Sequence, residues 1–185
     1  MKIILVLATG INIKSNHCKK DIEMNHSQLK SLYRASEIQI SYKNKVPYGD
    51  RVRIQQPKEA YQTIMHSWDK NKIELVEQFK ILLLDRANHC LGFSEISTGG
   101  ITGCIADPKI IFSTLLKAKA SAVILFHNHP SCNLEPSDAD IVLTNKIWQG
   151  GKLLDISVLD HQIIPPHGYF SFVENGIMPN QQPKP

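Results

Sequence analysis

Two histidines and an aspartate in one short stretch of the chain could hold a metal ion. His127 and His129 are separated by a single residue and followed by Pro130, and Asp140 comes one loop later. Two neutral imidazoles and one carboxylate suit Zn²⁺ as ligands, and they leave one tetrahedral position open for water. An open position distinguishes a catalytic zinc site from a structural one. These residue types therefore favour a zinc hydrolase.

The elements around these three residues explain how they would meet. Residues 122–126 form a continuous apolar run of strand length, and Pro130 ends the strand because proline cannot donate to a ladder. Residues two apart on a strand point to the same side, so both imidazoles leave one face. A helix beginning at Ser137 would carry Asp140 in its first turn, from where it can point back at the strand end. We therefore expect the site between a strand end and a helix start.

Both halves of this pattern also have an ordinary structural interpretation. His127 and His129 at a strand end could simply hydrogen-bond to the loop that follows. Ser137 and Asp140 have the spacing of a capping box, in which a side chain at each end bonds to the backbone N–H of the other. A cap fixes the direction of the carboxylate, so the capping and metal-binding interpretations are compatible.

The rest of the chain alternates between strand and helix patterns. Turn residues at 85–88 separate two apolar runs and predict a hairpin, and Gly150-Gly151 predicts a helix end. Paired strands with helices between them indicate an α/β fold of the α+β type, in which helices pack against one mixed sheet. The predicted strands are 36–43, 79–84, 91–96, 122–126, 156–159, 161–164 and 169–173, and the predicted helices are 27–34, 57–68, 108–119 and 137–150.

Length and composition fit one globular domain with flanking segments. The chain has 185 residues, of which 42% are hydrophobic and 21% charged, and a core of ordinary size can form at this length. No apolar run approaches the roughly 18 residues of a membrane-spanning helix, so we expect no membrane partner. We predict an N-terminal extension at 1–35, the main domain at 36–177 and a disordered Pro/Gln-rich tail at 178–185.

Cysteine spacing and charge bear on location and partners. The four cysteines form no C-x-x-C pair, so we expect free thiols in a reducing cytoplasm. Residues 1–56 contain ten Lys/Arg against four Asp/Glu, and residues 57–185 contain eleven against thirteen. A basic leading segment can bind DNA, but these charges lack interleaved aromatic residues and also fit a solvated surface.

The motif as a whole resembles a known signature. His-x-His-Pro followed by Ser-x-x-Asp, with a glutamate one strand earlier, is similar to the signature of the JAB/JAMM (MPN) metalloproteases. Residues 96–103, 107–108, 127–131, 136–137 and 159–161 resemble the RadC branch of that family, and the resemblance covers about 38–176. It implies a cytidine-deaminase-like fold with a curved mixed sheet between helices, one zinc ion, and hydrolysis of peptide or isopeptide bonds.

The resemblance also implies roles for individual residues. His127, His129 and Asp140 would be the zinc ligands, and Ser137 would donate a hydrogen bond to the oxyanion of the reaction. The catalytic glutamate of the family precedes the first core strand, which is the place of Glu77. Glu74 is the rival, one helical turn earlier.

Two features depart from the motif or lie outside it. Cys132 stands where RadC-like sequences usually have glycine, and it is either an ordinary turn residue or an adventitious metal ligand. Asp160 and His161 form a pair that recurs in the RadC branch. They would orient a metal ligand or touch the substrate, or else make a buried hydrogen bond at a strand end.

Three functions remain to be compared. The first is a zinc-dependent hydrolase acting on a protein or peptide. The second is a nucleic-acid-associated DNA repair accessory protein of the RadC type, in which zinc is structural or vestigial. Longer RadC-like proteins carry an N-terminal helix-hairpin-helix region suited to DNA, and nothing before residue 57 matches it. The third is a scaffold without metal. No sequence pattern predicts the oligomeric state.

Overall fold

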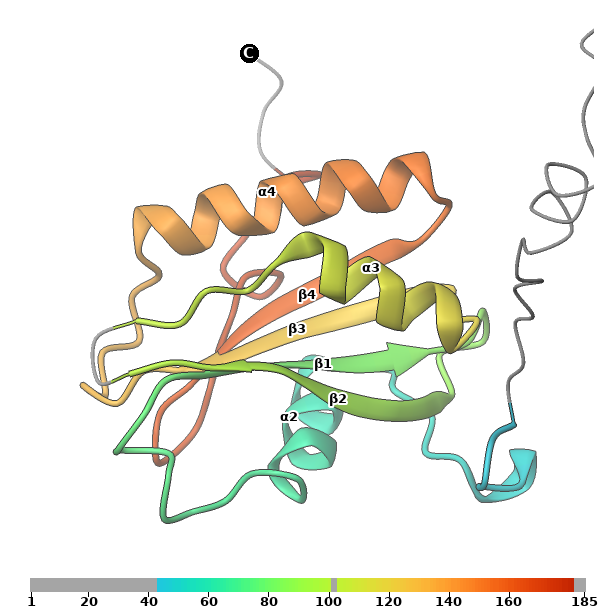
Figure 1. Cartoon of the computed structure of the whole chain (residues 1–185), viewed down its shortest axis with the longest axis horizontal. Coiled ribbons are helices and arrows are strands. Elements are labelled where there is room, and N and C mark those ends of the chain that lie inside the picture. The colour runs from blue at the N-terminus through green and yellow to red at the C-terminus, as the bar shows by residue number, and fades with distance from the viewer. Residues whose placement is uncertain (1–42, 101–102, 182–185) are drawn as a thin grey trace, which may run out of the picture. The chain divides into compact units, whose positions relative to one another are not determined.

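The computed structural model of the chain describes residues 43–100 and 103–181. The helix predicted at 27–34 and nearly all of the strand predicted at 36–43 lie outside these residues, as does the end of the predicted tail. The described part contains one mixed sheet with helices on both faces (Figure 1). This confirms the predicted fold class.

The sheet has five strands in the order β2-β1-β3-β4-β5. Strand β1 is antiparallel to both β2 and β3, β3 is parallel to β4, and β5 is antiparallel to β4. The predicted hairpin is β1 and β2, joined by a turn in which Asp85 Oδ1 accepts from the N–H groups of Ala87 and His89. The strands are β1 (Gln78–Leu84), β2 (Cys90–Thr98), β3 (Ala122–Asn128), β4 (Ser157–Ile164) and β5 (Phe170–Ser171).

Helices α3 and α4 cover one face of the sheet, and α2 lies on the other (Figure 1). The side chain of Asp107 accepts from the N–H of Lys109 and caps α3, and Ser137 caps α4. None of the helices in the described residues is long and apolar enough to cross a membrane. The helices are η1 (Tyr48–Asp50, a short 3-10 helix), α2 (Pro57–Met65), α3 (Pro108–Lys117) and α4 (Asp138–Leu153).

Two predicted boundaries are wrong for physical reasons. Helix α4 continues through Gly150 and Gly151 to Leu153. These glycines serve close packing, because a Cβ on Gly151 would lie 2.4 Å from Ile156 O and one on Gly150 would lie 2.7 Å from the Phe112 ring. The strands predicted at 156–159 and 161–164 are one strand, β4, since the polar residue between them is buried and hydrogen-bonded.

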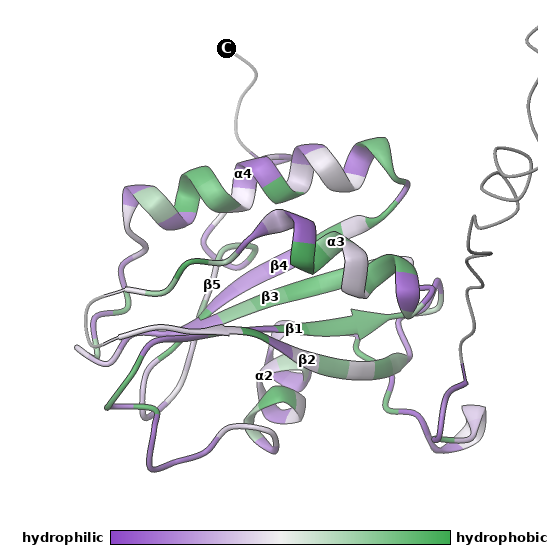
Figure 2. Ribbon diagram, in the orientation of Figure 1, coloured by the Kyte–Doolittle hydropathy of each residue, from purple (hydrophilic) through white to green (hydrophobic). Residues whose placement is uncertain are grey.

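Every residue of β1 and β3 is buried, which explains why most residues of both strands are apolar (Figure 2). Alternate side chains enter two separate cores. One core lies under α3 and α4, and the other lies under α2. The central strands are therefore held on both faces, and their ends give rigid support to whatever side chains emerge there. The largest buried side chains on the α3 and α4 side include Phe79, Ile81, Ile111, Leu115, Leu125 and Ile147.

Candidate metal centre

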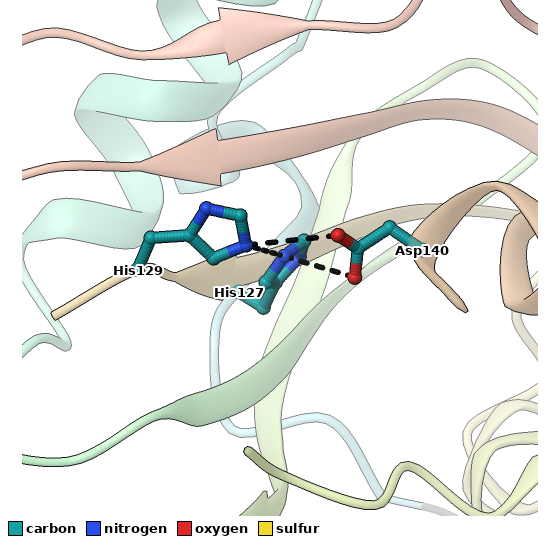
Figure 3. A group of neighbouring side chains, drawn as sticks. All are labelled: His127, His129 and Asp140. Atoms are coloured by element: carbon teal, nitrogen blue, oxygen red, sulfur yellow. Dashed lines mark hydrogen bonds and ion pairs between the residues drawn. The ribbon is translucent and has the colours of Figure 1, made fainter. Parts of the chain in front are cut away.

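The end of β3 and the first turn of α4 bring His127, His129 and Asp140 together (Figure 3). One ligand atom from each of the three residues lies within 4.8 Å of the other two. The two Nε2 atoms are 2.8 Å apart, Asp140 Oδ1 is 3.2 Å from His127 Nε2, and Asp140 Oδ2 is 3.6 Å from His129 Nε2. The structure thus brings the three sequence-predicted ligands into one group.

A chain of hydrogen bonds orients the ring of His127. Its Nδ1 is 2.9 Å from His161 Nε2, and His161 Nδ1 is 2.6 Å from the Thr144 hydroxyl. The Thr144 hydroxyl donates its only proton to Asp140 O, so it accepts from His161 Nδ1–H. Burial above all, with the neighbouring His127, holds the pKa of His161 well below its usual value and keeps its ring neutral. His127 therefore donates from Nδ1, and its Nε2 faces the site, where it offers a lone pair to a metal when the ring is neutral.

The same reasoning applies to His129. Its Nδ1 lies 2.7 Å from Asn133 O, and a carbonyl can only accept, so the ring donates from Nδ1. In the neutral rings that a metal requires, two Nε2 lone pairs at 2.8 Å would repel each other, and either a metal ion or a proton shared with Asp140 removes this repulsion. Together with the carboxylate, this donor set fits a zinc ion.

Asp140 is held in place by the predicted capping box. Its Oδ2 accepts from the Ser137 N–H at 2.8 Å and from the Ser137 hydroxyl at 2.6 Å, and its own N–H donates to Ser137 Oγ at 3.2 Å. Burial raises the pKa of the Asp140 carboxyl, but hydrogen bonds from His127 and His129 outweigh burial and hold this pKa well below its usual range. The carboxylate is therefore ionised and restrained, as a metal ligand needs to be.

Glu77 lies beside this group because of strand register. Phe79 pairs with His127 in antiparallel β1 and β3, and continuing that register places residue 77 opposite residue 129. Burial raises the pKa of the Glu77 carboxyl, while the nearby His127 and His129 lower it in part. The backbone of Cys104 lowers this pKa by a smaller amount. Glu74, the rival candidate, is exposed.

Comparison with known proteins identifies the family. Residues 54–177 match the model of the RadC-like JAB domain. The chain belongs to this family. It is 44% identical over 101 residues to a UPF0758 protein of Flavobacterium johnsoniae, covering 55% of this chain and 44% of the relative. It is 37% identical over 126 residues to a UPF0758 protein of Methanosarcina mazei, covering 68% of this chain and 54% of the relative. The chain spans about half the length of the curated relatives that it matches.

In this RadC-like JAB domain the neighbouring residues Asp160 and His161 have different surroundings. Strand alternation sends their side chains to opposite faces of β4. His161 contacts the candidate ligand His127, whereas Asp160 accepts four hydrogen bonds away from it, one of them from the Ser171 hydroxyl at 2.7 Å. His161 thus fixes the ring of His127, and Asp160 is the centre of a buried hydrogen-bond cluster.

Cys132 in the RadC-like JAB domain has the backbone conformation that glycine favours. Its φ is +63°, and its N–H donates to His129 O at 2.9 Å, which closes a tight turn after the ligand. The thiol is exposed and is not among the ligand atoms grouped at the site. Here Cys132 is a turn residue. Cys90 and Cys104 are also free thiols.

Two residues of the site were missed by the sequence reasoning. Thr144 follows Asp140 by one helical turn, so it shares the helix face of that ligand, and this spacing was a usable signal. Asn128 stands between the two ligand histidines and is completely buried. A polar residue that continues a buried strand indicates specific hydrogen bonds, because a buried amide must be hydrogen-bonded.

Proposed function

We propose that this RadC-like JAB domain is a zinc-dependent hydrolase that cleaves peptide or isopeptide amide bonds. The observation that carries the proposal is the convergence of two imidazole Nε2 atoms and one ionised carboxylate at the end of β3. His127, His129 and Asp140 would hold the metal, with the open side left to water and substrate. Zinc in such a site activates water and polarises the scissile carbonyl.

Glu77 would be the general base and acid. Its pKa is raised by burial, which suits a group that must accept a proton from water near neutral pH and return it. The carboxylate lies close enough to His127 and His129 for their charges to affect its pKa, yet it is not one of the grouped ligand atoms. We therefore assign it to the proton of the attacking water, which then passes to the leaving nitrogen.

Ser137 would stabilise the oxyanion, after a small rotation. Its hydroxyl proton points at Asp140 Oδ2, so serving the oxyanion requires a turn about the Cβ–Oγ bond. Asp140 Oδ2 keeps the Ser137 backbone N–H at 2.8 Å when the hydroxyl turns away. An oxyanion donor of this kind contributes about 3 kcal/mol to transition-state stabilisation.

The test separates metal binding from catalysis. Zinc-loaded parent, Glu77→Gln and Glu74→Gln are incubated with a peptide library and with isopeptide-linked protein conjugates, and products are identified by mass spectrometry. We expect cleavage by the parent and by Glu74→Gln, and a loss of about 100-fold or more in Glu77→Gln with zinc content unchanged. A zinc-loaded parent that cleaves none of these substrates, or a fully active Glu77→Gln, contradicts the proposal. Salt-dependent DNA binding without hydrolysis would favour the accessory-protein function instead.

A further inference from the structure

Asn128 lies between two metal ligands but points away from them. Along β3 and its continuation, His127 and His129 direct their rings to the face that α4 covers, and alternation sends the Asn128 side chain to the opposite face. There it is fully buried, at 0% exposure, against the segment that precedes β1. That segment contains Glu77.

The Asn128 amide makes three hydrogen bonds, two to this segment and one to the first residue of β1. Its Nδ2 donates to Ile73 O at 2.6 Å and to Val76 O at 2.8 Å, and its Oδ1 accepts from the Gln78 N–H at 2.7 Å. Val76 and Gln78 flank Glu77, so one side chain is bonded to the backbone on both sides of that residue. Two donors and an acceptor on one planar group are what a side-chain amide offers.

Glu77 itself is fixed from the other direction. Its N–H donates to Gly100 O at 3.0 Å, and its C=O accepts from the Gly99 N–H at 2.8 Å. These two bonds connect Glu77 to the chain that follows β2. Asn128 supplies the connection to β3, the strand that ends in the metal ligands.

We infer that Asn128 is a positioning residue, which holds the Glu77 backbone in register with the two histidine ligands so that its carboxylate faces the metal site. The inference rests on the proposed function, in which Glu77 transfers the proton of the attacking water. Asn128 is covalently joined to both His127 and His129, so ligands and base are tied together as one unit. A displacement of about 1 Å at a reacting group can cost about 100-fold in rate.

The experiment compares two substitutions with a matched control in the full chain. Asn128→Ala removes all three hydrogen bonds, and Asn128→Asp keeps the size of the side chain and the acceptor for the Gln78 N–H but loses both donors. The control is Ser171→Ala, which deletes a buried hydroxyl bonded to Asp160 on the far side of β3 from Glu77. Hydrogen exchange of residues 73–79 and zinc content are measured for each protein.

We expect exchange across residues 73–79 to become on the order of 10-fold faster in Asn128→Ala, with a smaller increase in Asn128→Asp and zinc content as in the parent. Ser171→Ala should leave this segment as protected as in the parent. Unchanged exchange in both Asn128 variants, or an equal increase in Ser171→Ala, would overturn the inference. If Asn128→Ala does not fold, hydrogen exchange of residues 73–79 in Asn128→Asp tests the inference instead.

Turnover gives a second readout. On a substrate that the parent cleaves, Asn128→Ala should lower kcat by about 100-fold with little change in KM. A kcat equal to that of the parent would overturn the positioning role. Absence of turnover in the parent itself would contradict the proposed function, while hydrogen exchange still decides whether Asn128 positions the segment.

Discussion

Asp140 and Asp160 are two aspartates of one domain that are enclosed by hydrogen bonds in different ways. Each Asp160 oxygen accepts two hydrogen bonds, Oδ1 from the N–H groups of His161 and Val173 and Oδ2 from the side chains of Gln162 and Ser171. Asp140 uses Oδ2 for the two Ser137 donors, and its Oδ1 faces His127 Nε2 at 3.2 Å. Both oxygens of Asp160 are thus occupied by hydrogen-bond donors, whereas Asp140 directs Oδ1 into the candidate metal site.

The pKa values of the two carboxyl groups shift in opposite directions because their hydrogen-bond partners differ. Burial raises the pKa of the Asp160 carboxyl, and its neutral donors offset this only in part. Burial also raises the pKa of Asp140, but the imidazoles of His127 and His129 outweigh it. Asp160, among neutral donors, connects β4 to β5 and to the residues that follow β5. Asp140, beside two imidazoles, is suited to binding a cation. If this contrast is correct, substitution of Asp140 should affect metal binding, and substitution of Asp160 should affect stability.

The largest expected effect is the loss of zinc from Asp140→Ala. Removal of a ligand should weaken zinc binding by more than about 100-fold, because loss of an outer hydrogen-bond partner alone costs about 10- to 100-fold. Asp138→Ala is the control, since Asp138 is an exposed aspartate in the same helical turn. Competition with a chromophoric chelator measures the affinities. An Asp140→Ala affinity within about tenfold of the parent would remove Asp140 from the ligand set.

Asp160→Ala should show the complementary behaviour. It leaves four donors without an acceptor inside the β4–β5 region and should lower the free energy of unfolding by about 2–4 kcal/mol, with zinc still bound. Urea denaturation of the zinc-loaded proteins measures the change. A loss of stability below about 1 kcal/mol, or loss of zinc, would mean that Asp160 is not the structural partner described here.

Acidity should act oppositely on the metal-free and the zinc-loaded protein. The hydrogen bond to Asp140 raises the pKa of His129 above 6.5. In the metal-free protein this pair stabilises the fold fully below pH 6.5, and the stabilisation is lost as pH rises through the raised pKa. Zinc needs the neutral imidazole, so the stabilisation from added zinc grows with pH.

As the pH rises from about 5 to about 8, the His129–Asp140 pair should therefore contribute less and less to the melting temperature of the metal-free protein. Over the same range, the increase in melting temperature caused by added zinc should become larger. His129→Ala should lose both trends, and Asp160→Ala should keep both. A zinc increment that is constant or decreasing with pH in the parent would contradict the assignment of His129.

The smallest expected effect concerns the hydrogen-bond chain behind His127. Thr144→Val keeps the shape of the side chain but removes the acceptor for His161 Nδ1–H, and it should weaken zinc binding by about 10-fold. Thr114→Val is a matched control, because Thr114 makes the same bond to the preceding turn of α3 without an imidazole partner. Equal zinc affinities in the two variants would show that this chain does not orient His127.

The predictable part of the site is the part that is local in sequence. The strand run at 122–126, Pro130 and the Ser137 cap placed His127, His129 and Asp140 in one group without knowledge of the sheet, because each depends on near neighbours. Glu77 required the family resemblance, since its proximity arises from the register of β1 against β3. The Gly150-Gly151 error had a similar origin, since only the packed fold brings Ile156 O against the helix.

The contacts that the sequence does not predict join residues far apart in the chain. Parallel pairing of β3 with β4 brings His161 to the ring of His127, and Asn128 reaches a segment more than fifty residues earlier in the chain. Such contacts follow from strand order and register, which hydrophobic periodicity does not specify. Asp160 and His161 were expected together, and the alternation of β4 separates them.

The most direct test of the metal centre is a crystal structure of the zinc-loaded chain with anomalous scattering recorded on both sides of the zinc absorption edge. The account predicts one strong anomalous peak per chain, within bonding distance of His127 Nε2, His129 Nε2 and an Asp140 carboxylate oxygen, with Glu77 beside it but not coordinated. The absence of a peak among these three residues, or a peak on Cys132 or Asp160 instead, would contradict it.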